Sequence, residues 1–296
     1  MSVKFLVTGS AGLIGSQVVK DLVKLKHEVY SCYHNQKPTY GIPIQLDLLD
    51  HDKIRQTLLE VKPDSIIHLA AATNVDHCET EKEFATRLNV ISTKIIAKQA
   101  AKQLAFFVYV STDYVFDGEH KLKKENYVPN PLGFYGKSKL NGEIILNNLA
   151  SSWCIARTST PFGIHPKKKS FPLWIKESLE SKKEISVLVD QFTSPTYVPN
   201  LSKMLIEIAT RQITGVIHLS GATRISRYHL AELISDKLNL DKKLLIPTKI
   251  DHMNWKAPRP KDSSLDVSLA IEILNEKPQT IQHGLDCFLN ELNNIK

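Results

Sequence analysis

The chain has 296 residues, 42% of them hydrophobic and 23% charged, a composition typical of a soluble globular protein rather than a disordered one. The net charge of +7 fits acidic ligands such as phosphates and nucleotides. Lys and Arg are otherwise scattered, and the short clusters at 121–124 and 167–169 lack interleaved aromatic residues. We therefore place both clusters in solvated loops and expect no nucleic-acid partner.

Cysteines and apolar runs narrow the class of protein further. The four cysteines stand far apart, which fits neither a disulfide framework nor a zinc site, and the histidines show no ligand spacing. No apolar run reaches membrane-spanning length, and the first apolar run resembles a strand rather than a signal peptide. We expect a cytoplasmic protein with no metal and no membrane partner.

The first half of the chain alternates apolar runs with segments of helical periodicity. Strands are predicted at 3–9, 28–34, 65–72, 105–111 and 153–159, and helices at about 14–25, 84–95 and 134–149. Continuous apolar strands separated by helices predict a parallel sheet covered on both faces. The predicted fold class is therefore α/β, a doubly wound parallel sheet of the Rossmann type.

Prolines divide the chain into shorter segments after about residue 160. Helices are predicted near 171–182, 200–211, 226–239 and 279–293, with a strand at 215–219. We divide the chain into an NADP(H)-binding Rossmann domain, 1–165, and a smaller, partly interleaved substrate-binding region, 166–296. The second region is expected to cover the carboxyl edge of the sheet, where ligands of open α/β sheets bind.

A glycine-rich segment, TGSAGLIG (8–15), joins the first strand to the first helix. Glycine permits a tight turn, close approach of the backbone to a pyrophosphate and close packing of helix on strand, and the helix N-terminus offers free N–H groups. Its place at the start of an alternating fold favours dinucleotide binding over an ordinary turn. The candidate cofactor-binding residues here are Gly9, Ser10, Ala11, Gly12, Leu13, Ile14 and Gly15.

The end of the second strand, SCYHNQKP (31–38), lacks the acidic residue that usually holds the ribose hydroxyls at an NAD site. His34 and Lys37 would instead face a 2′-phosphate, or they are simple loop residues. NADP(H) is therefore the favoured cofactor, and NAD(H) stays possible.

Tyr135 and Lys139 lie four residues apart on one face of a predicted helix. A free tyrosine titrates near 10, and a nearby ammonium lowers that pKa by stabilising the phenolate. Such a phenol can transfer a proton to a carbonyl oxygen as a hydride arrives. Thr112, at the end of a neighbouring strand, would donate a further hydrogen bond to that oxygen. These three residues are the predicted catalytic group.

The strand at 105–111 runs directly into Ser111, Thr112, Asp113 and Tyr114. Burying such groups without partners is costly, so we predict that a substrate ketone and a nicotinamide lie over them. Ser111, Thr112 and Asp113 are candidate substrate contacts. Asp113 either orients this loop or caps a turn.

These motifs resemble extended short-chain dehydrogenases/reductases. STDYVFDG (111–118), YGKSKLNGE (135–143), DQFTSPTYV (190–198) and PRPKDSSLD (258–266) resemble the dTDP-4-dehydrorhamnose reductase branch, and the similarity covers nearly the whole chain. The resemblance implies reduction by NADPH of the C4 ketone of a nucleotide-linked 6-deoxy-4-keto sugar. Tyr135 would be the acid, and Lys139 would tune it and hold the ribose.

The resemblance also implies further contacts. On the cofactor side they are Asp47, Leu48, Ala70, Ala71, Ala72 and Thr158, with Ser159 nearby and with Asn89 either anchoring the active-site backbone or lying on a helix surface. On the substrate side they are Thr73, Val75, Asp76, Thr196 and Arg259. A guanidinium suits a diphosphate because it grips two oxygens at once. Trp174 and Trp255 are packing residues or substrate neighbours.

The chain departs from that branch in two respects. RTST (157–160) places Thr160 where the branch commonly has a tryptophan, which leaves the sugar open, and the acidic residues that hold a metal at a dimer contact in some members have no counterpart. A homodimer stays possible. A second resemblance, to the regulatory β subunit of methionine adenosyltransferase, rests on NNL (147–149), HLSG (218–221) and PRP (258–260). It implies an NADP(H)-binding partner of that enzyme rather than a catalyst.

Overall fold

A seven-stranded parallel sheet forms the centre of the computed structural model, which describes residues 2–149 and 152–294. Its strands are β1 (Lys4–Thr8), β2 (Glu28–Tyr33), β3 (Ile42–Gln45), β4 (Ser65–His68), β5 (Phe106–Thr112), β6 (Trp153–Thr158) and β11 (Gly215–His218). They are ordered β11-β6-β5-β4-β1-β2-β3, so the direction of winding reverses between β1 and β4. The predicted doubly wound fold is confirmed, and ligands of such sheets bind at this reversal.

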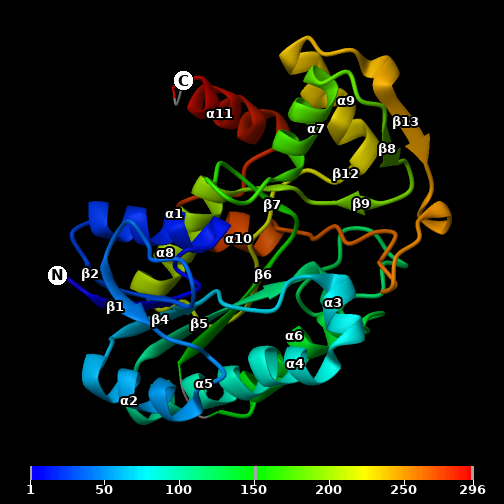
Figure 1. Cartoon of the computed structure of the whole chain (residues 1–296). Coiled ribbons are helices and arrows are strands. Elements are labelled where there is room, and N and C mark those ends of the chain that lie inside the picture. The colour runs from blue at the N-terminus through cyan, green and yellow to red at the C-terminus, as the bar shows by residue number, and fades with distance from the viewer. Residues whose placement is uncertain (1, 150–151, 295–296) are drawn as a thin grey trace.

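Helices cover both faces of the sheet (Figure 1). One face carries α1 (Leu13–Lys24), α8 (Val198–Arg211) and α10 (Ser268–Ile273), and the other carries α2 (His51–Val61), α5 (Ser92–Lys102) and α6 (Phe134–Asn147). Neighbouring residues of β1 pack into different apolar clusters. Phe5 and Val7 pack against the helices of the first face, and Leu6 packs against those of the second. This alternation follows from the strand's two-residue period, and it explains why the central strands are apolar throughout.

Several elements differ from those predicted. β4 ends at His68 rather than at residue 72, because Leu69 and Ala70 turn away to hydrogen-bond the side chain of Thr8. The helix predicted at 84–95 is divided into α4 (Lys82–Thr86), a π-helical turn (Arg87–Ile91) and α5. β3 and α2 were not predicted: β3 is a short, largely exposed edge strand, whereas α2 does carry apolar residues at helical spacing.

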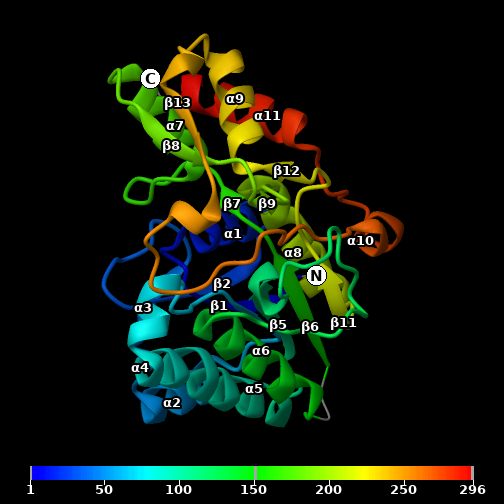
Figure 2. The same cartoon turned by 90° about the vertical axis from the view of Figure 1, so that its right-hand side faces the viewer.

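A second lobe lies over the carboxyl edge of the sheet (Figures 1 and 2). It contains α7 (Phe171–Glu180), β8 (Ile185–Leu188), α9 (Arg227–Leu238), β13 (Leu245–Thr248) and α11 (Ile281–Asn294) around their own apolar cluster. Short ladders pair β7 (Pro161–Phe162) with β10 (Thr196–Tyr197) and β9 (Phe192–Thr193) with β12 (Ile225–Ser226). The chain therefore enters this lobe after β7, returns to the sheet as α8 and β11, and enters the lobe again.

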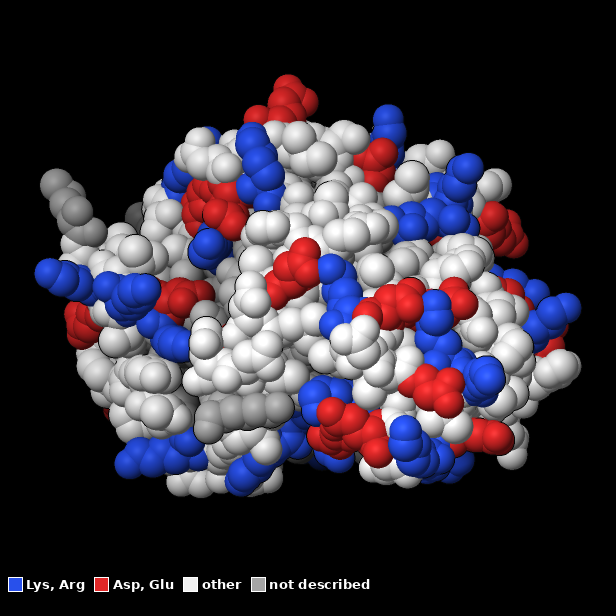
Figure 3. Space-filling model, turned by 90° about the horizontal axis from the view of Figure 1, so that it is seen from above, with Lys and Arg blue, Asp and Glu red and all other residues white. Residues whose placement is uncertain are grey.

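The charged residues on the face shown in Figure 3 are mixed, with Lys and Arg lying among Asp and Glu. The lysines at 167–169 are exposed, as predicted for a solvated loop. In the other cluster, Lys123 is buried against Asp117 at 2.5 Å, so the prediction is wrong for that residue. None of the helices in the described part of the chain combines the length and apolarity that a bilayer crossing requires.

A buried ion pair connects α6 to the sheet. Arg157 on β6 donates from Nη2 to Oε2 of Glu143 at 2.7 Å and from Nε to Oε1 at 3.0 Å. The two side chains are only 4% and 3% exposed. Removing one partner would leave an unpaired charge in the interior, which costs more than removing both.

We expect Arg157→Met to lower the free energy of unfolding by about 3–5 kcal/mol, because the carboxylate of Glu143 stays buried without its partner. The double change Glu143→Leu, Arg157→Met should recover most of this loss. Arg55→Met, at the exposed Arg55–Asp52 pair, is the control and should change stability by no more than about 0.5 kcal/mol. Urea unfolding measures all three, and a double variant as unstable as the single one would contradict the prediction.

Candidate active site

The loop between β1 and α1 needs glycine at two of its three motif positions. Gly9 has φ +68°, and a Cβ there would lie 2.8 Å from the amide nitrogen of Ala70. A Cβ on Gly15 would lie 2.1 Å from the carbonyl oxygen of Gly9. The first turn of α1 contains no acidic residue, so no carboxylate of that turn competes with an anion for its N–H groups and positive dipole end. Ser10 is buried and donates to the carbonyl of Cys32 at 2.8 Å.

A chain of buried hydrogen bonds shapes the segment after β4. The hydroxyl oxygen of Thr8 accepts from the N–H groups of Leu69 and Ala70, each at 3.2 Å. Its own proton is therefore donated to Nδ1 of His68 at 2.7 Å, and Nε2 of His68 donates to Thr93 at 3.0 Å. Burial lowers the pKa of His68 to about 3, helped by the charge of Lys139, so this imidazole stays neutral.

Asn89 lies in the π-helical turn and is 1% exposed. Its Oδ1 accepts from the amide of Ala72 at 2.7 Å, while its Nδ2 donates to the Ala72 carbonyl at 3.1 Å and to the Ser138 hydroxyl at 2.9 Å. The side chain therefore anchors active-site backbone and does not lie on a helix surface. π-Helical turns are frequent at functional sites because they redirect a side chain within a helix.

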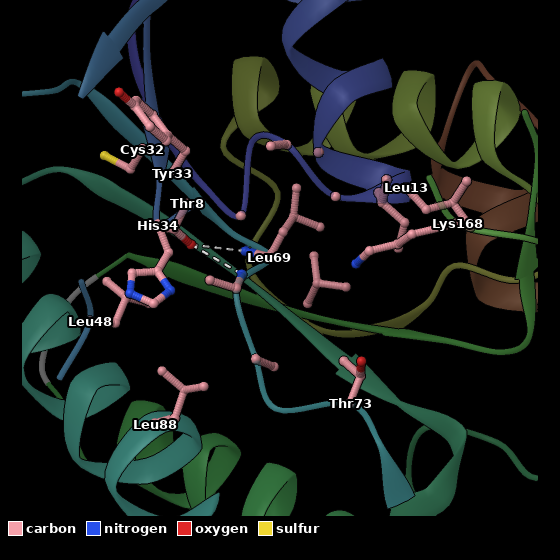
Figure 4. A pocket seen from close by; sticks show the side chains of 18 of the residues that line it. Thr8, Leu13, Cys32, Tyr33, His34, Leu48, Leu69, Thr73, Leu88 and Lys168 are labelled. Carbon is pink, nitrogen blue, oxygen red and sulfur yellow. Dashed lines mark hydrogen bonds between the residues drawn. The ribbon is translucent and has the colours of Figure 1, made fainter. Parts of the chain in front are cut away.

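A cavity of about 770 Å³ extends along the carboxyl edge of the sheet, next to the glycine loop (Figure 4). It brings together most of the predicted residues: Gly9, Ala11, Gly12, Leu13, Ile14, Gly15, His34, Asp47, Leu48, Ala70, Ala71, Thr73, Ser111, Thr112, Asp113, Tyr135, Lys139 and Thr158. Its lining does not include Ser10, Lys37, Ala72, Val75, Asp76, Asn89, Thr196 or Arg259.

One end of the cavity carries His34, whose Nε2 lies 3.7 Å from Oδ2 of Asp47. Asn35 and Gln36 also line this end, whereas Lys37 does not. A carboxylate thus does reach the place where an acid at the end of β2 was missing, but it comes from the segment after β3.

The opposite end carries the predicted catalytic residues. Lys139 is 3% exposed, its ammonium lies 4.1 Å from the ring centroid of Tyr109, and burial lowers its pKa to about 7 against the opposing effect of Glu143. Burial raises the pKa of Tyr135, and the hydroxyl of Thr112 opposes this shift. The expected lowering of the Tyr135 pKa by the ammonium of Lys139 is not found: desolvation raises this pKa, and the group that opposes the rise is Thr112.

The polar residues at the end of β5 and directly after it are held by hydrogen bonds. Asp113 accepts from the Thr112 hydroxyl at 3.0 Å and from the Ser159 hydroxyl at 2.7 Å, and burial raises its pKa. It therefore orients this loop. Ser111 donates to Glu143 at 2.5 Å. Within the described residues, the buried hydroxyl of Thr158 has no hydrogen-bond partner and faces the same cavity. Together with the glycine cradle, such an unpaired hydroxyl fits a polar dinucleotide.

A second cavity of about 280 Å³ borders the second lobe and has aromatic walls formed by Tyr114, Phe171, Trp174 and Trp255. Arg227 and Arg259 also line it. Arg259 is held by both carboxylate oxygens of Asp76, at 3.0 and 2.9 Å, and this hydrogen bonding lowers the pKa of Asp76 to about 2. Arg227 contacts the Thr160 hydroxyl at 3.4 Å and thereby borders the first cavity. Thr196 is fully buried and bonded to the Ser159 carbonyl at 2.6 Å.

Several residues of this site escaped the sequence analysis, among them Asn35 and Gln36 in the first cavity. Two others come from the second lobe: Arg227 carried no motif, and the exposed Lys168 was placed in a solvated loop but also lines the first cavity. No local signal distinguishes either of them, since each reaches its cavity through the folding of the second lobe. In the described part of the chain, no group of three His, Cys, Asp or Glu side chains is arranged to hold a metal ion.

A doubly wound sheet with a glycine loop after β1 and a Tyr-x-x-x-Lys pair on α6 defines an extended short-chain dehydrogenase/reductase. The chain belongs to the family described as the RmlD substrate binding domain, whose model matches residues 3–294.

Similar proteins include both reductases and a subunit of a methionine adenosyltransferase. A probable low-salt glycan biosynthesis reductase, Agl14, of Haloferax volcanii is 31% identical over 267 residues, covering 88% of this chain and 89% of that protein. Methionine adenosyltransferase 2 subunit beta of Xenopus tropicalis is 33% identical over 273 residues, covering 89% and 80%. The crystal structure of dTDP-4-dehydrorhamnose reductase from Bacillus anthracis in complex with NADP has a TM-score of 0.88 at 29% identity, covering 98% and 100%.

The buried Lys139 should make stability depend on pH. Its pKa is about 7 in the folded chain and near 10.5 when unfolded. Between these values the unfolded chain binds a proton that the folded chain does not, so stability rises with pH. We expect Lys139→Met to be more stable than the parent at pH 7 by at least about 1 kcal/mol and to lose this rise.

Lys137→Met is the control, since Lys137 lies on the same helix but is exposed. Urea unfolding without added nucleotide, between pH 7 and pH 10, measures the difference. A Lys139→Met variant that keeps the full pH dependence would show that another group causes it.

Proposed function

We propose that the protein reduces the C4 ketone of a nucleotide-linked 6-deoxy-4-keto sugar with NADPH, a reaction of the dTDP-4-dehydrorhamnose reductase type. The observation that carries the proposal is the meeting of Thr112, Tyr135 and Lys139 at one end of a cavity that extends over the glycine loop. The similarity to Agl14 and to the NADP complex supports it.

The side chains would divide the work as follows. The bound nicotinamide supplies a hydride, and the phenol of Tyr135 supplies the proton that completes the alcohol. A raised pKa keeps Tyr135 protonated at neutral pH, as an acid requires. The hydroxyl of Thr112 donates to Asp113 in the structure and would turn its single proton to the ketone oxygen when substrate binds, and Lys139 would hold the ribose and stabilise the phenolate.

The cofactor would lie with its adenine end at His34, Asn35, Gln36, Asp47 and Leu48. His34 favours NADP(H) because an imidazole can face a 2′-phosphate, whereas Asp47 beside it suits a free ribose and keeps NAD(H) possible. Ala70, Ala71 and Thr158 would line its path towards the catalytic end. Ala72 and Asn89 would support that path from behind through their mutual hydrogen bonds.

The nucleotide part of the substrate would occupy the second cavity. Its aromatic walls suit a base, and the guanidinium groups of Arg227 and Arg259 suit a diphosphate. Thr73 lines the first cavity and would contact the sugar, whereas Val75, which begins α3 (Val75–Thr80), lines neither of the two cavities. Asp76 would position Arg259 rather than bind substrate itself, and Thr196 would support the loop of Ser159.

We expect Tyr135→Phe to reduce turnover by at least ~100-fold, because the proton donor is lost while the ring remains. Turnover is followed as oxidation of NADPH in the presence of a dTDP-4-keto-6-deoxy sugar, and NADPH binding should persist. Tyr127→Phe removes a hydroxyl from an exposed tyrosine and should be fully active. A fully active Tyr135→Phe would refute the assignment of the acid.

Arg227→Met should raise KM for the nucleotide sugar by about 10-fold or more, because a charge-assisted bond to the diphosphate disappears. Binding of NADPH should be unchanged, since Arg227 does not line the first cavity. Steady-state kinetics measures KM for the nucleotide sugar, and fluorescence titration measures the binding of NADPH. An unchanged KM would remove Arg227 from the substrate site.

A regulatory subunit is the second candidate, because the chain is 33% identical to methionine adenosyltransferase 2 subunit beta over 273 residues. In that case the protein would bind NADP(H) and a methionine adenosyltransferase but not turn over nucleotide sugars. Co-purification with a methionine adenosyltransferase from the same source, without NADPH oxidation on any nucleotide sugar, would favour this function over the reductase. The cytoplasmic location stays a prediction, and the homodimer stays one possible assembly.

A further inference from the structure

The turn between β7 and α7 is tied to the glycine loop. His165 is 7% exposed, and its Nε2 donates to the carbonyl of Ala11 at 3.1 Å. Its Nδ1 accepts from the amides of Lys167 and Lys168, both at 3.1 Å. The far end of the turn is closed by Ser170, which donates to the carbonyl of Gly163 at 2.9 Å. One buried imidazole thus fixes the backbone of Lys168 relative to the loop after β1.

Lys168 extends from this turn into the first cavity, where Figure 4 shows its ammonium pointing towards the space below the loop before Leu13. The nitrogen lies 3.9 Å from the point where a Cβ would stand on Gly12, the N-cap of α1. The ammonium and the helix N-terminus therefore present positive charge to the same space. Its neighbour Lys169 is directed elsewhere and pairs with Glu177 at 2.5 Å.

The carboxylates of the described cavity lining do not compete for this charge. They belong to Asp47, which accepts from the Leu49 amide at 2.9 Å, and to Asp113, which is bonded to Thr112 and Ser159. Asp47 lies at the end with His34, and Asp113 lies at the catalytic end. The middle of the cavity, over the glycine loop, is cationic.

We propose that Lys168 binds the pyrophosphate of the dinucleotide, so that the second lobe completes the cofactor site instead of serving the substrate alone. The proposal rests on the proposed function only in requiring that the first cavity binds a nicotinamide dinucleotide. Phosphate oxygens above a helix N-terminus are the acceptors that an ammonium at this position would meet. His165 positions this lysine through the backbone and does not touch the ligand.

The test compares Lys168→Ala with Lys167→Ala, a change of equal charge on the same exposed turn. Binding of NADP⁺, NAD⁺ and adenosine 2′-monophosphate is measured by calorimetry on the full chain. Lys168→Ala should weaken NADP⁺ and NAD⁺ by a similar factor, about 5- to 20-fold, and should leave the monophosphate unchanged because it has no pyrophosphate. Lys167→Ala should match the parent, and Lys168→Arg should restore most of the affinity.

The remaining outcomes separate this inference from the proposed function. Equal affinities of Lys168→Ala and Lys167→Ala for NADP⁺, with tight binding by the parent, would overturn the role of Lys168 and leave the reductase intact. A loss of affinity in Lys168→Ala that is confined to NADP⁺ and the monophosphate would also overturn the proposal, because it would show that Lys168 binds the 2′-phosphate. A parent chain that binds none of the three ligands would reject the dinucleotide site itself.

Discussion

Just beyond the carboxyl ends of β1 and β4, the backbone of Gly9 packs directly against that of Ala70, with no side chain between them. The left-handed φ of +68° at Gly9 makes the turn possible, and the hydroxyl of Thr8 fixes the separation by accepting from the Ala70 amide. Because winding reverses between these two strands, this contact forms the floor of the crevice. The start of α1, the course of residues 69–73 and the shape of the cavity above them all depend on it.

The buried ionisable groups at the catalytic end of the first cavity lower the stability of the fold. An ammonium beside the ring of Tyr109 and a carboxylate at Asp113 are both buried, and in each case burial shifts the pKa towards the neutral form. A core chosen for stability would hold apolar groups at these positions. Several shifted pKa values lie together at one end of the cavity, close to the hydroxyl groups at the end of β5. Such a concentration is typical of sites of acid–base chemistry.

The two regions of the chain are joined by polar contacts between residues far apart in sequence. Asp76 holds Arg259 and the backbone of the segment before it, and His165 holds the turn that carries Lys168 against Ala11. Both contacts pair a residue beside one cavity with a residue from the other region. The lobe is thus placed over the sheet by contacts of residues that also surround the two cavities.

The amino-acid sequence alone determined the class of fold, the glycine loop and the Tyr135–Lys139 pair. Each depends on local rules: the strand and helix periods, the need for glycine at Gly9, and the spacing that places two side chains on one helix face. The family resemblance implied Asp76 and Arg259 as two separate substrate contacts. Only the tertiary structure paired them with each other, aimed Lys168 into the cofactor cavity and raised the pKa of Tyr135. Pairing, access and desolvation arise between segments distant in sequence, and no local pattern encodes which of those segments will meet.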